Sequence, residues 1–206
     1  MAITPLSVKL SAEVQPGDRV PAPDHLELVQ AFANTFWDLP QGRPEQFRTP
    51  AALAAWLRRR GLIATGVRLS DSDLRRALDV REGIRALLFA NSGLEPDTGA
   101  IERLNQGLRR ATVVVRLAPT SRPEFAAPTC DLDGALGLVA ASVAMAQLEG
   151  RFERLKVCPG PACGWAFYDH SRNLAGTWCS MSICGSRMKA REYRRRRRQA
   201  RRAMNA

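Results

Sequence analysis

The sequence predicts a mainly α-helical N-terminal domain with one small β-hairpin, an α+β arrangement, followed by a small module built from a hairpin, a helix and four cysteines. Three observations support this fold class. Apolar residues recur at helical spacing through most of residues 25–150, one short β-branched run interrupts them, and cysteine, aromatic and basic residues become frequent together after Gly150. We therefore expect an N-terminal arm at 1–24, a helical domain at 25–150 and the cysteine module at 151–202.

Five helices are expected in the helical domain. They run from His25 to a stop at Pro40, from Pro50 to Gly61, from Asp71 to Asn91, from Asp97 to Arg110 and from Asp131 to Glu149. The second has the clearest start, because Thr49 can cap it and Pro50 suits its first position. The segment Asp131–Gly134 is similar to the start of a calcium loop but lacks the later ligands, so it is interpreted as a helix cap.

Strands are expected in two places. The β-branched segment Thr112–Leu117 and the segment Glu124–Ala127 flank a turn-rich stretch, which predicts a hairpin. A short strand is a candidate at Leu6–Val14, inside the proline-rich arm.

Charge is distributed unevenly along the chain of 206 residues. Hydrophobic residues make up 45% and charged residues 25%, which disfavours a disordered or fibrous protein. The net charge is +11, yet residues 1–150 are neutral and residues 187–202 hold nine Arg, one Lys and one Glu. Such a basic end indicates a polyanionic partner. Because Arg outnumbers Lys 28 to 3 in the whole chain, arginine-rich codon usage is the alternative explanation of the run.

The N-terminus and the apolar stretches indicate a cytoplasmic protein with no membrane partner. Met1–Gln15 has no basic segment followed by an apolar core, so no secretory signal is expected. The most apolar stretch, Ala135–Ala146, has about twelve residues, whereas roughly 20 span a bilayer. Five cysteines in such a protein argue against a disulfide framework.

Four of the five cysteines form two pairs with the same spacing. Four residues separate the members of each pair, and fifteen residues lie between the pairs. Four thiolates that converge in a tetrahedron are the closed donor set that structural Zn²⁺ prefers. The module is too short to build an adequate core, so the metal would supply its folding free energy. The expected zinc ligands are Cys158, Cys163, Cys179 and Cys184.

Three other interpretations of the cysteines compete with a zinc site. An iron–sulfur cluster also takes four cysteines, and a redox dithiol takes one pair, usually at Cys-x-x-Cys spacing. His170 is an alternative fourth ligand, although its position in an expected turn favours a surface or supporting role. Cys130 stands apart and is interpreted as a small, partly buried thiol rather than a nucleophile.

A helix is expected directly after Cys184, because the stretch contains good helix formers and no Pro. Its arginines Arg187, Arg191, Arg194, Arg195, Arg198 and Arg202 share one stripe at 3.6 residues per turn. Met188 and Tyr193 are expected to face the hairpin. Guanidinium groups bind phosphates bidentately and reach guanine edges. The residues expected to contact nucleic acid are Arg172, Arg187, Lys189, Arg191, Arg194, Arg195 and Arg198.

Two segments carry a resemblance to a known family. Residues 163–173 (CGWAFYDHSRN) and 178–191 (WCSMSICGSRMKAR) resemble the CGNR zinc finger. Upstream, residues 26–35 (LELVQAFANT) and later helical segments resemble the ABATE domain that precedes this finger in bacterial proteins. The resemblance covers roughly residues 25–200 and implies a stress-induced transcription regulator that holds zinc.

This chain departs from the finger's pattern at two places. Ser186 stands where the signature has Asn, and Ala175, Gly176 and Thr177 stand where the family usually has arginines. Zinc binding is expected to survive, since all four sulfurs remain. The missing arginines before Trp178 move the expected nucleic-acid contacts onto the helix.

The resemblance also makes Asn34 and Thr35 candidates for a small-molecule pocket. The alternative is a polar turn that satisfies the backbone at the end of the first helix. The sequence has no Gly-rich phosphate loop, no His-Glu-x-x-His and no Gly-x-Ser-x-Gly motif.

Together these observations predict a zinc-dependent DNA-binding regulator whose N-terminal domain senses an unidentified small-molecule effector or forms a homodimer. The first alternative is an RNA- or ribosome-associated module, which exposed aromatic residues on the finger would favour over duplex DNA. Burial of Trp165 and Trp178 would favour the duplex. The second alternative is an enzyme, for which no cluster of acid, base and nucleophile was found, so a non-enzymatic protein is expected.

Overall fold

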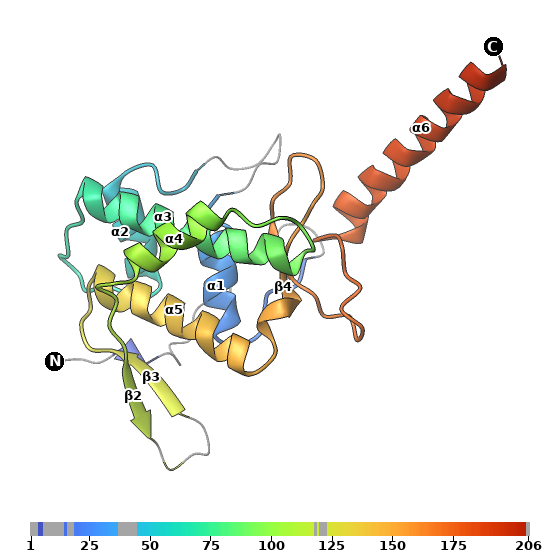
Figure 1. The fold of residues 1–206 in the computed structure, drawn as a ribbon. Coiled ribbons are helices and arrows are strands. Elements are labelled where there is room, and N and C mark those ends of the chain that lie inside the picture. Colours follow the sequence, from blue (N-terminus) through green and yellow to red (C-terminus); the bar gives the residue numbers. More distant parts are fainter. Residues whose placement is uncertain are drawn as a thin grey trace.

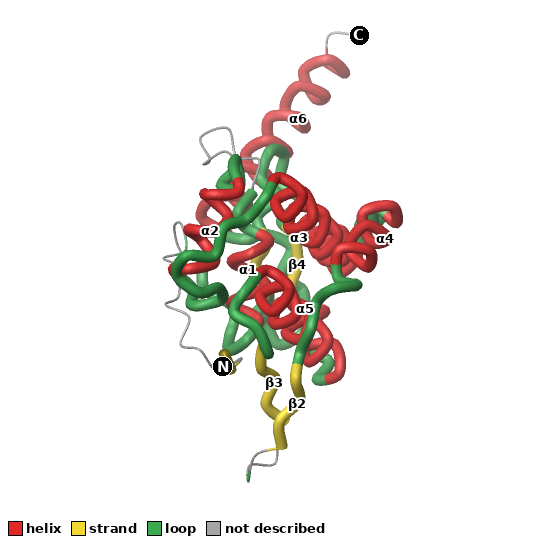
Figure 2. The backbone as a smooth tube through the Cα atoms, turned by 90° about the vertical axis from the view of Figure 1, so that its left-hand side faces the viewer, coloured by secondary structure: helices red, strands yellow, loops and turns green. Residues whose placement is uncertain are grey.

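The computed structural model describes residues 4, 5, 15, 19–36, 45–117, 119 and 123–204. Its elements are β1 (Thr4–Pro5), α1 (Leu26–Ala33), α2 (Pro50–Arg59), α3 (Asp71–Asn91), α4 (Thr98–Gly107), β2 (Val114–Leu117), β3 (Pro123–Ala127), α5 (Leu132–Leu148), the 3₁₀ turn η1 (Phe152–Arg154), β4 (Leu155–Val157), β5 (Ala166–Tyr168), the π-helical turn η2 (Met181–Gly185) and α6 (Ser186–Met204). Helices α1–α5 form the body, α6 projects from one end of it and the β2–β3 hairpin projects from the other (Figures 1 and 2).

Side-chain caps fix where four of the helices begin. Thr49 accepts a hydrogen bond from the Ala52 N–H at the start of α2, and Ser70 and Asp73 form a reciprocal capping box on α3. Asp97 and Asp131 cap α4 and α5 in the same way. The expected helices are therefore confirmed, and the calcium-like segment at 131–134 is a cap.

The ends of two helices differ from the expectation. Helix α1 stops at Ala33, several residues before Pro40, which lies outside the described residues. Helix α4 stops at Gly107 rather than at Arg110. Gly107 lies close to Val80 of α3, and a Cβ there would come within 2.8 Å of Val80 Cγ2. The last turn of α4 is thus defined by its close packing on α3.

Helix α1 lies at the centre of the body, and all of its residues are buried. It packs against α3, α5 and β5. Phe32 of α1 contacts Phe47 and Trp56, with ring centroids 5.6 to 5.8 Å apart in this group of three. Burying three aromatic rings and an apolar helix gives the body a large core of its own.

The expected hairpin is confirmed. Strands β2 and β3 pair antiparallel, with Val115 opposite Phe125, and β1 adds to the other edge of β3. The candidate strand at Leu6–Val14 lies outside the described residues. Three described residues of the arm, Gln15, Arg19 and Ala22, are buried, so these parts of the arm pack against the rest of the chain.

The second sheet joins the cysteine module to the body. Strands β4 and β5 pair antiparallel, and Leu155, Val157 and Ala166 belong to the same core as the body helices. The two strands flank the first cysteine pair, so that β5 lies between the two pairs and β4 precedes both. Within the described residues, no helix is long and apolar enough to cross a membrane.

Candidate metal centre and nucleic-acid interface

The four paired cysteines converge on one point. Their sulfur atoms all lie within 4.8 Å of one another, and each residue is buried. The distance between the Sγ atoms is 3.7 Å for Cys163 and Cys179 and 3.6 Å for Cys179 and Cys184. A tetrahedron with metal–sulfur bonds near 2.3 Å has edges of about 3.8 Å, so the arrangement fits one Zn²⁺ ion. All four cysteines are thus positioned as zinc ligands.

The first pair lies in the turn between β4 and β5. The Cys158 N–H donates to the Trp165 carbonyl at 2.9 Å, and the Cys163 N–H donates to the Gly160 carbonyl at 2.9 Å. A Cβ on Gly160 would lie 3.4 Å from the sulfurs of Cys158 and Cys184. The backbone at Gly160 therefore lies directly over the cluster, which limits the size of any residue at this position.

The second pair lies in the turn that leads into α6. Ser180 caps η2 by accepting from the Ile183 N–H at 3.0 Å, and Cys184 lies inside this turn. The Ser186 hydroxyl lies 2.8 Å from the carbonyl oxygens of both Met181 and Ser182. At the position where the finger's signature has Asn, Ser186 thus satisfies carbonyl groups of the turn that carries Cys184.

The crowding of four buried sulfurs also favours a bound cation. Hydrogen bonds from Cys158 and Cys179 lower the pKa of Cys163 to about 2. Burial and the electrostatic effect of the neighbouring Cys158 and Cys163 raise the pKa of Cys184 to about 12, and hydrogen bonds with these two cysteines raise the pKa of Cys179. The four buried sulfurs cannot all ionise without a compensating charge. A divalent metal ion supplies that charge and deprotonates its thiol ligands.

The other two candidates for metal or thiol chemistry lie outside the cluster. His170 is exposed, and its ring stacks edge-on against Tyr168 at a centroid distance of 4.8 Å. Cys130 is half-buried and does not belong to the group of four sulfurs.

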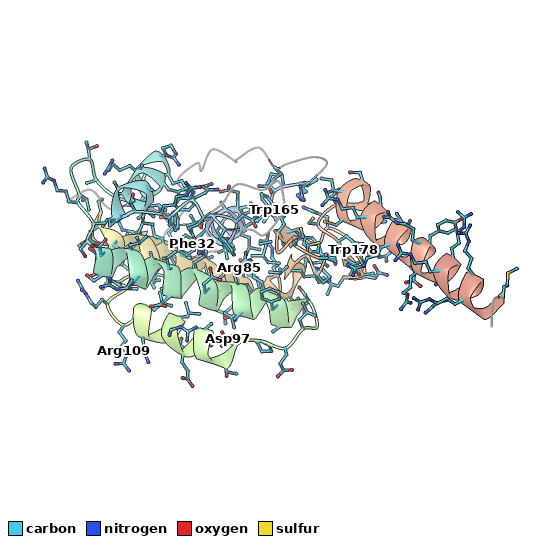
Figure 3. All side chains as sticks on the ribbon, turned by 90° about the horizontal axis from the view of Figure 1, so that it is seen from above. Phe32, Arg85, Asp97, Arg109, Trp165 and Trp178 are labelled. Carbon is cyan, nitrogen blue, oxygen red and sulfur yellow. The ribbon has the colours of Figure 1, made fainter. Side chains whose placement is uncertain are left out.

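Aromatic side chains cover the sulfur cluster. Trp165 and Phe167 are buried beside the cysteines, and Trp178 and Ile183 pack against them partly buried. In Figure 3, Trp165 and Trp178 lie between the body helices and the start of α6. These tryptophans are therefore occupied in packing around the metal centre.

A buried ion pair, which sequence reasoning missed, holds the loop between β5 and the second cysteine pair. Lys156 Nζ lies 2.8 Å from Asp169 Oδ2 and also donates to the carbonyls of Leu174 and Gly176. Burial opposes ionisation of Asp169, but hydrogen bonds from Lys156, Ser171 and the Gly176 N–H lower its pKa to about 2. A Cβ on Gly176 would lie 2.5 Å from Asp169 Oδ1. A larger residue at 176 would displace this carboxylate.

Helix α6 is exposed along its whole length, and none of its 19 residues is buried. Its helical geometry places five of the expected contact residues on one stripe together with Arg202, whereas Lys189 lies on the opposite side. Arg172 is exposed in the loop that Asp169 anchors. Tyr193 is 65% exposed, so the expectation that it faces the hairpin is wrong, and Met188 is only half-buried.

One carboxylate lies among the arginines of α6. Glu192 accepts hydrogen bonds from Arg195 at 2.9 Å and from Arg196 at 2.8 Å, which lower its pKa. These contacts are within the helix itself. Among the described residues, α6 has no ion pair with a carboxylate of the body.

Asn34 and Thr35 lie buried at the end of α1. Asn34 makes two hydrogen bonds with the Ala166 backbone of β5, one to the carbonyl at 2.9 Å and one from the N–H at 2.7 Å. The Thr35 hydroxyl donates to the Phe32 carbonyl and accepts from Arg81. A ligand-binding role for both residues stays a prediction. Their polar atoms hold α1 to β5 and to α3.

Sequence reasoning also missed Arg19. Its Nη2 atom donates to Cys179 Sγ at 3.2 Å, and its guanidinium lies over the Trp165 ring. An isolated Arg in a proline-rich arm gives no pattern that would predict this contact.

Comparisons with known proteins agree with the geometry. Residues 154–197 match the model of the CGNR zinc finger. Residues 26–149, more than half of the chain, match the ABATE family, described as "Putative stress-induced transcription regulator". A search of curated proteins gave no match. The chain belongs to the ABATE family and carries a C-terminal CGNR zinc finger with a four-cysteine site suited to Zn²⁺.

Proposed function

We propose that this chain is a zinc-dependent DNA-binding protein in which α6 contacts the DNA. The position of α6 is the observation that supports this function. Nine Arg and one Lys stand on an exposed helix that begins directly after the turn holding Cys184. A metal held by the four sulfurs fixes that turn, and with it the direction in which α6 leaves the finger (Figure 1).

The dimensions of α6 suit the major groove of duplex DNA. Nineteen residues at 1.5 Å per residue give a helix of about 28 Å. The major groove is about 12 Å wide and admits one α-helix. The stripe that contains Arg194 and Arg198 would face the base edges and one phosphate strand. Arg196 and Arg197 lie on the other sides of the helix. They would reach the phosphates of the second strand, on the other wall of the same groove.

The burial of the finger's tryptophans favours duplex DNA over single-stranded RNA as the partner. Proteins that bind single strands stack bases on exposed aromatic rings. Trp165 is buried in the finger, and Trp178 packs against the sulfur cluster. Tyr193 is the aromatic ring that α6 exposes, and it stands alone among arginines. RNA is accordingly included as a competitor in the experiment below.

The body would regulate the finger from the cytoplasm, either by sensing a small molecule or by pairing with a second copy of the chain. Gln30 of α1 and Asn34, directly after α1, both hydrogen-bond to the Ala166 backbone, next to Trp165. A displacement of the end of α1, caused by a bound small molecule or a second copy of the chain, would therefore move β5 directly. These hydrogen bonds would transmit the displacement from the body to the metal centre without a hinge motion between them.

The experiment is a binding titration of the full chain with labelled duplex DNA of random sequence at several salt concentrations. The logarithm of the binding constant is expected to fall linearly with the logarithm of salt, with a slope of about −0.9 for each phosphate neutralised. Duplex DNA should compete better than single-stranded RNA of equal length, and chelation of the metal should weaken binding. A slope near zero would contradict the proposed function. Better competition by RNA would favour the single-strand alternative.

A further inference from the structure

Arg19 contacts the metal centre from a distant part of the chain. It is separated from Cys179 by 160 positions, yet its Nη2 atom donates to the Cys179 sulfur at 3.2 Å. Its Cζ atom lies 5.0 Å from the centroid of the Trp165 ring, and the residue is only 7% exposed. Two independent contacts therefore hold this guanidinium, one to a ligand sulfur and one to the aromatic cover of the site.

We propose that Arg19 is a positioning residue that retains the metal from outside its coordination shell. Four thiolates around Zn²⁺ carry a net charge of −2, and burying that charge is costly unless a positive group compensates it. A charge-assisted hydrogen bond from Arg19 to Cys179 offsets part of this cost and orients the sulfur. Among the described residues, Arg19 is the side-chain cation with a hydrogen bond to one of the four sulfurs.

The same contact links the metal to the N-terminal arm. Three residues after Arg19, the Ala22 N–H donates to Gln30 of α1 at 2.7 Å, and Asp24 pairs with Arg151 at 3.1 Å. Gln30 in turn donates to the Ala166 carbonyl beside Trp165. The arm between Arg19 and Asp24 thus spans from the sulfur cluster to α1. When the metal leaves, the released thiolates take up protons, which lowers the negative charge that Arg19 compensates, so the arm should detach at Arg19.

The test compares three substitutions in the full zinc-loaded chain. Arg19→Gln removes the charge and the fork of donors, Arg19→Lys keeps the charge but loses the planar group that stacks on Trp165, and Arg58→Gln removes an exposed arginine of α2 as a matched control. Zinc affinity is measured by competition with a chromogenic chelator. Loss of an outer-shell partner typically weakens metal binding by roughly 10–100-fold. We expect that loss for Arg19→Gln, a smaller loss for Arg19→Lys and no change for Arg58→Gln.

Two results would overturn the proposal. One is an unchanged zinc affinity in Arg19→Gln, provided that far-ultraviolet circular dichroism shows an intact body. The other concerns the arm, which is followed by limited proteolysis with and without zinc. In the wild-type protein, zinc removal should expose the arm near Arg19, and in Arg19→Gln the arm should be cleaved in both states. Zinc-independent cleavage of the wild-type arm would contradict the link. None of these readouts involves DNA, so they are independent of the proposed function.

Discussion

The body and the finger differ in what holds each of them together. The body has a continuous apolar core around α1, capped helices and no net charge over residues 1–150. The finger has a small cluster of four sulfurs and a few aromatic rings, and its exposed helix α6 has no buried residue. Stability should therefore decrease from the body, which needs no metal, to the finger, which needs one, and then to α6.

The β4–β5 hairpin belongs to both regions, because side chains alternate between the two faces of a strand. Ala166 faces the body core, whereas its neighbours Trp165 and Phe167 pack beside the sulfurs. At the end of α3, Asn91 donates to the Leu155 carbonyl of β4 at 2.9 Å, and Ser92 donates to the Val157 carbonyl at 3.0 Å. The body therefore supports one half of the metal site even before the second cysteine pair is in place.

Metal removal is expected to give the largest difference between the two regions. Structural Zn²⁺ sites contribute about 10–16 kcal/mol of apparent binding free energy, and the body core contains no cysteine. Chelation, or Cys184→Ser, should release the turn into α6 and abolish tight DNA binding, while circular dichroism still shows folded α1–α5. If the body unfolds at the same chelator concentration as the finger, the two regions form one cooperative unit and the comparison fails.

The arginine stripe is expected to give the next largest effect. Arg194→Gln combined with Arg198→Gln removes two phosphate contacts, so the salt slope should become smaller by about 1.8 and the affinity should fall roughly tenfold or more at 0.1 M salt. The matched control is Arg58→Gln with Arg59→Gln, which removes the same charge from an exposed part of α2. Equal losses in both pairs would mean that net charge, rather than the position of α6, determines binding.

The buried ion pair Lys156–Asp169 predicts that the stability of the finger depends on pH. Because the pKa of Asp169 is about 2 in the folded protein and 3.8 in a free carboxyl group, its ionisation contributes about 2 kcal/mol of stability. A lowered pKa means that this contribution is complete above about pH 5 and disappears as the pH falls from about 4 to 2. Asp169→Asn should thus be less stable than the wild-type protein at pH 7, and equal to it near pH 2.

Chemical denaturation of both proteins across this pH range measures the difference. Zinc release at acid pH affects both proteins, so subtracting the two curves isolates the charge of Asp169 over the pH range in which zinc stays bound. A difference that stays constant down to pH 2 would show that Asp169 acts through packing and not through its charge.

The features that sequence reasoning predicted correctly are encoded locally. Thr49, Ser70 and Asp131 each cap the helix that begins at the next residue. The spacing of the cysteine pairs indicates a tetrahedral metal site without any knowledge of the fold. The sequence did not locate the two strands of the finger's hairpin. Strands β4 and β5 have three residues each, which is too short for alternation to be visible in the sequence.

The features that sequence reasoning missed join residues far apart in the chain. Asn34 bonds to Ala166 across 132 positions and Arg19 bonds to Cys179 across 160. Neither contact produces a periodicity or a motif, because each depends on how the body and finger pack. The ligand-binding role expected of Asn34 stays a prediction, and its hydrogen-bond partner in the structure is a strand of the finger.

The smallest expected effect concerns Glu192, the carboxylate among the arginines of α6. Its hydrogen bonds to Arg195 and Arg196 hold two guanidinium groups that would otherwise be available to phosphates. Exposed ion pairs of this kind contribute little to stability, so Glu192→Gln should leave the melting temperature unchanged. Removing one negative charge should instead tighten DNA binding by a few-fold at low salt, an advantage that fades as salt screens the helix. Weaker binding by Glu192→Gln would mean that Glu192 orients these arginines for DNA, and α6 would then be a preorganised surface rather than a simple stripe of charge.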